Sequence, residues 1–336
     1  MADKRLNKDQ FFGKLAELDE AGLKTALWTL YWRGSAPVRE RIESAIDPRV
    51  EAVRKVAAAA PPDADDVLQE VLDFVGLAGS GAYLGGDRRV SPKERSGWRF
   101  TFRRLADQSR AALAGPDVTS AGEALEALVD LAQQTKSYDL FRSDDPVEAA
   151  RFVVSDAVGA LWTRFVQEYG FAGFARRAAG QLYRWEERHG WTRYGYGWVA
   201  ERERPLAEVV TQLLPTTDAW GQFADAYLVA LDEAARTAPS RRSHYGQRAE
   251  DRTDALAMWH GRLLDRLAGS DHEDRLDRIV RHPTLTGPEQ TFLQARLAEY
   301  RGDRDAGAVL IRKCLAVLPG HPEFRAFAED IDAGAS

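Results

Sequence analysis

Apolar residues recur at helical spacing along almost the whole chain, and this pattern constrains the fold more than any other feature. After Asp9, the residues Phe11, Phe12, Leu15 and Leu18 follow an i, i+1, i+4, i+7 pattern, which places them on one face of a helix. Sustained alternation of apolar and polar residues, which is typical of strands, is nearly absent from the sequence. The pattern predicts an all-α fold.

Helix-start residues divide this pattern into helices joined by short loops. Further helices are predicted after Pro37 and Asp47. Asp145-Pro146 combines a capping residue with a first-turn proline and predicts a long helix that runs to Gly170. Helices joined by loops of a few residues favour stacked antiparallel hairpins in an α-solenoid-like arrangement, with glycine- and aromatic-rich loops.

Residues 289–324 have the pattern of one helical hairpin with small residues at the helix contact. Apolar residues mark the first helix, Gly302-Asp303 marks the turn, and the second helix ends before Pro319. This segment resembles a tetratricopeptide-type hairpin, whose small positions match Ala295, Gly307 and Cys314. The resemblance covers about one tenth of the chain. It implies a hairpin that caps a helical array.

These patterns divide the chain into three regions. Residues 1–77 are expected to form HEAT-like helical hairpins, and residues 78–200 a central helical region with a basic helix and an aromatic loop. Residues 201–336 are expected to form a C-terminal helical region that ends in the tetratricopeptide-like hairpin. The sequence leaves open whether these regions form one superhelix or separate domains.

Composition restricts the classes of partner and cofactor. The net charge is −6, so the protein as a whole repels nucleic acid and anionic lipid, and any polyanion site must be a local patch. Cys314 is the single cysteine and the six histidines are scattered, so we expect no disulfide, metal or cofactor. We expect no membrane partner and a cytoplasmic location, because the sequence has no run of about 18 apolar residues and no apolar leader.

A basic segment, residues 88–104, is the first candidate binding site. It carries seven positive residues against Glu94 alone. Its candidate contact residues are Arg88, Arg89, Arg95, Trp98, Arg99 and Arg103. Arginines at i, i+4 and i+8 beside an aromatic stripe are suited to phosphate contact and base stacking. Residues 117–148 are acidic, so ion pairs between the two segments are the competing interpretation.

An aromatic segment, residues 183–198, is the second candidate. It interleaves six tyrosines and tryptophans with three arginines, and its second half is rich in glycine. Its candidate contact residues are Trp185, Arg188, Trp191, Arg193, Tyr194, Tyr196 and Trp198. Such a loop forms a binding surface, or it fills the space between helical layers. The sequence leaves both interpretations open.

The chain has no recognisable phosphate loop, zinc-binding helix or nucleophile elbow. We therefore expect a non-enzymatic scaffold or adaptor that binds another protein, although an enzyme with an unfamiliar site stays open. The alternative is a nucleic-acid-associated protein, part of a repair or defence assembly, that uses the basic and aromatic segments together. The position of these segments on the folded chain distinguishes the two hypotheses.

Overall fold

The computed structural model describes residues 8–35, 38–39, 42–43, 46, 60–85, 87–237 and 249–333. The described residues form 15 helices and no strand, which confirms the predicted all-α class. The chain divides into two compact units, Met1–Pro61 and Pro62–Ser336. Most of residues 36–59, where two helices are predicted, lie outside the described part. The predicted boundary at residue 77 falls within helix α5 (Ala64–Gly79).

The first unit contains helices α1 (Lys8–Ala16) and α2 (Glu20–Arg33). The Asp19 side chain accepts a hydrogen bond from the backbone N–H of Gly22 and so caps α2. Neither helix has a buried side chain. The apolar pattern that predicted these helices is therefore not matched by a core within the described residues of this unit.

The second unit holds the other helices of the described chain. Beside α5 these are α6 (Pro92–Ala112), α7 (Val118–Ser137), α8 (Pro146–Ala150), α9 (Val154–Trp185), α10 (Leu206–Thr211), α11 (Thr217–Thr237), α12 (Ala249–Ala255), α13 (Ala257–Leu267), α14 (Asp274–Val280), α15 (Pro288–Tyr300), α16 (Arg304–Val317) and α17 (Pro322–Ala333).

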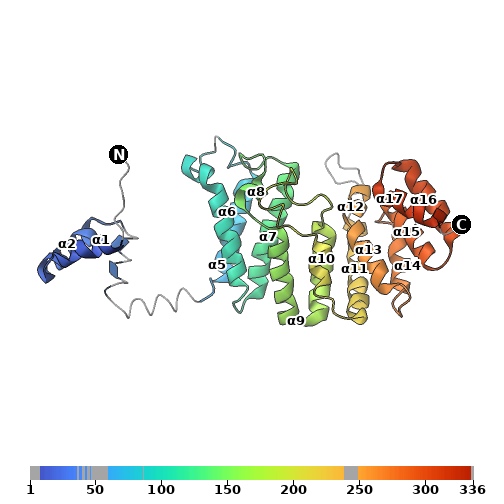
Figure 1. The fold of residues 1–336 in the computed structure, drawn as a ribbon, viewed down its shortest axis with the longest axis horizontal. Helices are drawn as coiled ribbons and strands as arrows, with labels where there is room; N and C mark the ends of the chain where they lie inside the picture. The colour runs from blue at the N-terminus through green and yellow to red at the C-terminus, as the bar shows by residue number, and fades with distance from the viewer. Residues whose placement is uncertain are drawn as a thin grey trace. The chain divides into compact units, whose positions relative to one another are not determined.

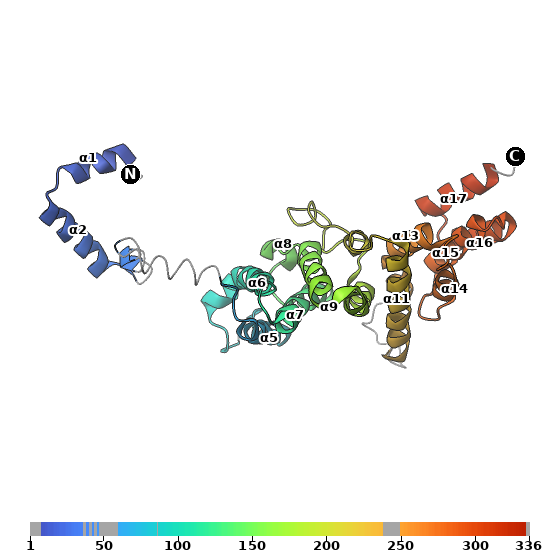
Figure 2. The same cartoon turned by 90° about the horizontal axis from the view of Figure 1, so that it is seen from below.

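Helices of this unit pack against one another in the order α5, α7, α9, α11, α13, α15, α16, α17. Figures 1 and 2 show this succession, with α5 and α7 at one end of the unit and α15–α17 at the other. One apolar core runs from Ala64 to Leu297, and a second, smaller core lies among α15, α16 and α17. Packed helix pairs are thus present, whereas a regular solenoid is not detected in the described residues.

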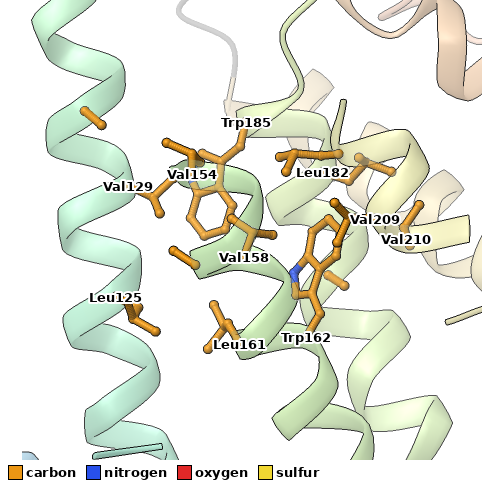
Figure 3. Packing of buried hydrophobic residues seen from close by; sticks show 14 of the residues in the cluster. Leu125, Val129, Val154, Val158, Leu161, Trp162, Leu182, Trp185, Val209 and Val210 are labelled. Atoms are coloured by element: carbon orange, nitrogen blue, oxygen red, sulfur yellow. The ribbon is translucent and has the colours of Figure 1, made fainter. Parts of the chain in front are cut away.

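The centre of the large core lies between α7, α9 and α10. Leu125 of α7, Trp162 of α9 and Val209 of α10 are all buried there, together with Trp185 (Figure 3). The Trp162 indole N–H donates to the Gln181 side-chain oxygen over 2.7 Å, so the polar atom of this buried ring is satisfied. This packing fixes the end of α9, from which the aromatic segment continues.

The predicted long helix from Pro146 to Gly170 is interrupted. Helix α8 ends at Ala150, Arg151 adopts a left-handed conformation with φ of 51°, and α9 starts at Val154. Phe152 and Val153 are buried in this connection, so burial of their side chains outweighs local helix preference. At Gly170 the backbone is non-helical, with φ of 64°, which places a kink where the helix was predicted to stop.

The C-terminal segment forms a helical hairpin, α15 and α16, with its turn at residues 301–303. A Cβ atom on Gly307 would lie 3.4 Å from the Ala295 carbonyl oxygen, and Cys314 is buried. The three small positions therefore lie at the helix contact. That the hairpin of α15 and α16 belongs to the tetratricopeptide type stays a prediction.

No helix in the described part of the chain combines the length and apolar character that crossing a bilayer requires.

Candidate functional site

The basic segment consists of residues 88–91, which precede α6, and the first part of α6, and its arginines have different roles. Ser91 and Glu94 form a reciprocal capping box at the helix N-terminus. Arg95 donates to the carbonyl oxygens of Asp87 and Val90 at 2.8 and 3.0 Å. Arg103 donates to the carbonyl oxygen of Ala150 at 3.1 Å. Two arginines of the predicted row therefore bind the protein's own backbone.

Other members of the segment are divided between the core and the surface. Trp98 is buried and stacks on Phe141, with ring centroids 4.2 Å apart. Arg89 forms an ion pair with Asp87. Arg88 and Arg99 are exposed, and the Arg99 guanidinium lies 4.8 Å from the centre of the Phe100 ring.

The acidic residues 117–148 do not neutralise the basic segment. Among the described residues, no ion pair joins residues 88–104 to residues 117–148. Arg104 pairs instead with Glu70 of α5. The competing interpretation, an ion-pair network between these two segments, is therefore wrong, and the acidic side chains contact the aromatic segment instead.

The first half of the aromatic segment is structural. Trp185 is fully buried, and its indole N–H donates to Asp130 over 2.7 Å. Trp191 is also buried, with the Lys136 ammonium group 5.5 Å from its ring centre. Arg188 forms an ion pair with Glu289 of α15. These three candidate residues fill space and join helices.

The second half presents a different surface. Tyr194 is 53% exposed, Tyr196 is 71% exposed and Trp198 is 38% exposed, and the two tyrosine rings lie 5.8 Å apart. The guanidinium groups of Arg151 and Arg202 lie 5.6 and 4.2 Å from the Trp198 ring centre. We call these five residues the aromatic surface.

Acidic residues around α8 fix the backbone of this loop. The Glu148 carboxylate accepts from the backbone N–H groups of Trp198 and Val199 at 2.9 and 2.8 Å. The Asp145 carboxylate accepts from the backbone N–H of Arg193 at 2.9 Å. The Arg193 side chain forms an ion pair with Asp139 at 3.1 Å. The acidic segment therefore binds the backbone of this loop at Arg193, Trp198 and Val199.

Gly197 permits the close approach of Glu148 to the loop. Its φ of 122° is unfavourable for side-chain-bearing residues, and a Cβ atom there would lie 2.7 Å from the Glu148 carboxylate. The glycines of this segment are thus needed for a tight, ordered loop.

Glu186, which is buried, and Glu203, which is partly buried, each accept hydrogen bonds from the backbone at the start of a helix. Glu186 accepts from the N–H groups of Leu206 and Ala207 at the start of α10. Glu203 accepts from the N–H groups of Val154 and Ser155 at the start of α9. Burial raises the pKa of each carboxyl to about 7, although these hydrogen bonds act in the opposite direction.

The two candidate segments meet at the end of α8. Arg103 of α6 binds the carbonyl oxygen of Ala150, and the next residue, Arg151, lies over Trp198. Sequence reasoning did not identify Arg151 or Arg202 as site residues. Arg202 follows Trp198 by four positions and its guanidinium donates to the Trp198 carbonyl oxygen, so helical spacing carried a weak signal for it. Nothing in the sequence pattern marked Arg151.

The described residues contain no group of three or more metal-ligating side chains. No protein-family model, curated protein or solved structure matches the chain. The geometry of the site therefore carries the functional argument alone.

Proposed function

We propose that this protein is a non-enzymatic scaffold or adaptor that binds another protein through the aromatic surface. The observation that carries the proposal is the exposure of Tyr194, Tyr196 and Trp198 on a loop held by Glu148. Tyrosine and tryptophan provide a large contact area with few rotatable bonds. A loop already fixed in the free protein loses little conformational entropy on binding.

The occupied arginines also favour a protein partner. Arg95 and Arg103 bind backbone carbonyl groups, and Arg188 lies in an ion-pair cluster. These side chains are therefore not free for phosphate groups. Arg151 and Arg202 remain beside Trp198, and clustered Trp, Tyr and Arg are the residues that most often dominate protein interfaces.

The proposal includes an α-solenoid-like stack of hairpins as the scaffold. The serial packing of α5, α7, α9, α11 and α13 supports it, because each helix contacts mainly its neighbours in that order.

Quantitative affinity capture tests the proposal. The wild type and the Tyr194→Ala/Tyr196→Ala variant would be used as baits in extracts of the source cells, treated with nuclease. We expect at least one protein to be retained at least tenfold less by the variant, as for interface hot spots. The matched control is Val309→Ala/Val317→Ala, two exposed apolar residues on α16, which should retain that protein normally. Equal retention by all three baits contradicts the proposal.

Nucleic-acid binding is the second candidate. One observation favours it: Arg88, Lys93 and Arg99 are exposed at the start of α6, and none of them forms an ion pair with another described residue. Fluorescence anisotropy with short single- and double-stranded DNA and RNA at two salt concentrations tests it. The logarithm of the binding constant falls linearly with the logarithm of the salt concentration. If this slope becomes shallower by about two to three units in the Arg88→Ala/Lys93→Ala/Arg99→Ala variant, nucleic acid is supported as the partner.

A further inference from the structure

A cleft is lined by the C-terminal half of α9 and by α11. Its volume is about 1260 Å³. Its lining includes Gly180 and Tyr183 of α9, Val229 and Ala230 of α11, and Arg252 of α12. The volume exceeds the roughly 300–1,000 Å³ of a typical small-molecule site. None of the five residues of the aromatic surface lines the cleft.

Arg252 is a buried cation without a carboxylate partner. Its side chain is 7% exposed, and its two terminal nitrogens donate to the carbonyl oxygens of Arg184 and Glu186 at the end of α9. Its Nε atom, which is itself buried, has no hydrogen-bond partner among the described residues. Among the described residues no carboxylate forms an ion pair with it. Backbone carbonyl groups orient the guanidinium, and the carboxylates of Glu186 and Glu187 attract it without forming a direct ion pair.

The other arginines of the cleft differ in their availability. Arg184 already pairs with Glu126 and Asp130, at 3.6 and 3.2 Å. Arg177 lies over the ring of Tyr169, 3.9 Å from its centre. Arg176 is exposed at the lining and forms no ion pair with a described residue. Arg252 and Arg176 therefore give the cleft positive charge that no direct ion pair with a described residue offsets.

The wall formed by α11 is mainly apolar. Ala226, Val229, Ala230 and Ala234 line the cleft, and Val229 is 61% exposed. Glu233 is the single acidic residue that this helix contributes to the lining. A ligand that suits both walls must combine negative charge with apolar groups.

We propose that this cleft binds an acidic peptide segment of a partner protein, with one carboxylate against Arg252 and apolar side chains against Val229 and Ala230. A peptide meets both requirements because carboxylate and apolar side chains alternate along one chain. Inorganic phosphate would neutralise Arg252 but leave the α11 wall uncovered. The inference rests on the proposed protein-binding function and assigns a second surface to it.

Selection from a peptide library tests this assignment with the full chain. One library holds twelve-residue peptides with glutamate and leucine at varied spacing, and a second library replaces each glutamate with lysine. The wild-type protein is expected to retain glutamate peptides at least tenfold more strongly than their lysine counterparts. Raised salt should weaken retention because part of the attraction is between exposed charges.

Variants then locate the site. Arg252→Gln removes the charge, and it should weaken peptide binding at least tenfold. Arg176→Gln, at the exposed lining, should weaken it several-fold without disturbing the fold. Arg312→Gln, an exposed arginine on α16, is the matched control and should bind peptides as the wild type does.

Three outcomes overturn the proposal. The first is that the protein retains both libraries equally. The second is that neither Arg252→Gln nor Arg176→Gln changes peptide binding. The third is that the protein binds inorganic phosphate but retains no peptide. None of these three outcomes contradicts protein binding by the aromatic surface, because the Tyr194→Ala/Tyr196→Ala bait tests that surface separately. A fourth outcome also overturns it: loss of peptide binding in Tyr194→Ala/Tyr196→Ala, with normal binding in Arg176→Gln, would place the peptides on the aromatic surface.

Discussion

Arg188 and Glu289 form a hydrogen-bonded ion pair, 2.6 Å long, that joins the loop after α9 to the start of α15. The Glu289 side chain is only 5% exposed. Arg188 also pairs with Asp254 of α12 and lies 2.9 Å from the His321 ring nitrogen. A residue that sequence analysis selected for partner binding therefore holds three segments of the chain together.

Replacing Arg188 should strongly destabilise the protein. In Arg188→Ala, Glu289 stays buried without its cation, so we expect the free energy of unfolding to fall by about 3–5 kcal/mol. Urea unfolding followed by circular dichroism measures the change. Adding Glu289→Gln should restore part of the loss, because the buried charge is then removed.

An exposed ion pair provides the comparison. Arg296 pairs with Asp265 at 3.0 Å, and both side chains are partly exposed. Arg296→Ala should therefore cost less than about 1 kcal/mol. If Arg188→Ala costs no more than this control, the pair with Glu289 does not stabilise the fold as described.

Glu186 and Glu203 should make stability depend on pH. Each carboxyl has a pKa of about 7 in the folded protein, against 4.5 for an ordinary glutamate. Between these values the folded state binds more protons than the unfolded state, so the free energy of unfolding falls as pH rises from about 4.5 to about 7. For the more deeply buried Glu186 the loss is about 3 kcal/mol.

Glutamine variants isolate this contribution. Glu186→Gln imitates the protonated carboxyl group, so the stability difference between variant and wild type should increase in favour of the variant from pH 5 to pH 7.5. Urea unfolding at both pH values measures this difference. Glu329→Gln, at an exposed position of α17, should show no such change. A difference for Glu186→Gln that is constant with pH would be inconsistent with the raised pKa.

Arg151 combines backbone strain with a role in the aromatic surface. Its φ of 51° is unfavourable for any residue with a Cβ atom, so Arg151→Gly should be about 1 kcal/mol more stable than Arg151→Ala. Both variants lose the guanidinium beside Trp198, so both should weaken partner binding equally. Thermal unfolding and affinity capture measure the two effects, and equal stability of the two variants would argue against the left-handed backbone.

Gly197 should not tolerate a side chain. In Gly197→Ala the new Cβ atom would lie 2.7 Å from the Glu148 carboxylate at a residue with φ of 122°, so the carboxylate must shift and its hydrogen bonds to the loop weaken. We expect partner retention to fall at least as far as in Tyr196→Ala, with the main core unaffected. Hydrogen exchange at the Trp198 and Val199 amides measures the loop directly, and unchanged protection of these amides would refute this view of the loop.

Local patterns predicted the helices well because capping residues and apolar spacing act within a few positions of the chain. Asp145 and Pro146 mark the start of α8 as predicted, and Gly302 lies in the turn between α15 and α16. The break after Ala150 was missed because it depends on burial of Phe152 and Val153, which only the tertiary fold determines.

The candidate site was predicted only in part for the same reason. Tyr194, Tyr196 and Trp198 were selected from composition and remain exposed, whereas Trp98, Trp185 and Trp191 have the same residue chemistry and are buried. Sequence spacing cannot distinguish an aromatic ring in the core from one on the surface when both lie in one short segment. The partners of the acidic residues 139–148 were also missed, because they lie about fifty positions away in the chain.

Photo-crosslinking from the aromatic surface tests the central claim most directly. A photoreactive benzoylphenylalanine at position 196, in place of the 71%-exposed Tyr196, would be activated by ultraviolet light in the source cells. We predict a discrete crosslinked protein that is absent when the same group replaces Val317 of α16. No crosslink at position 196, or a crosslink to nucleic acid instead of protein, would contradict the claim that this surface binds another protein.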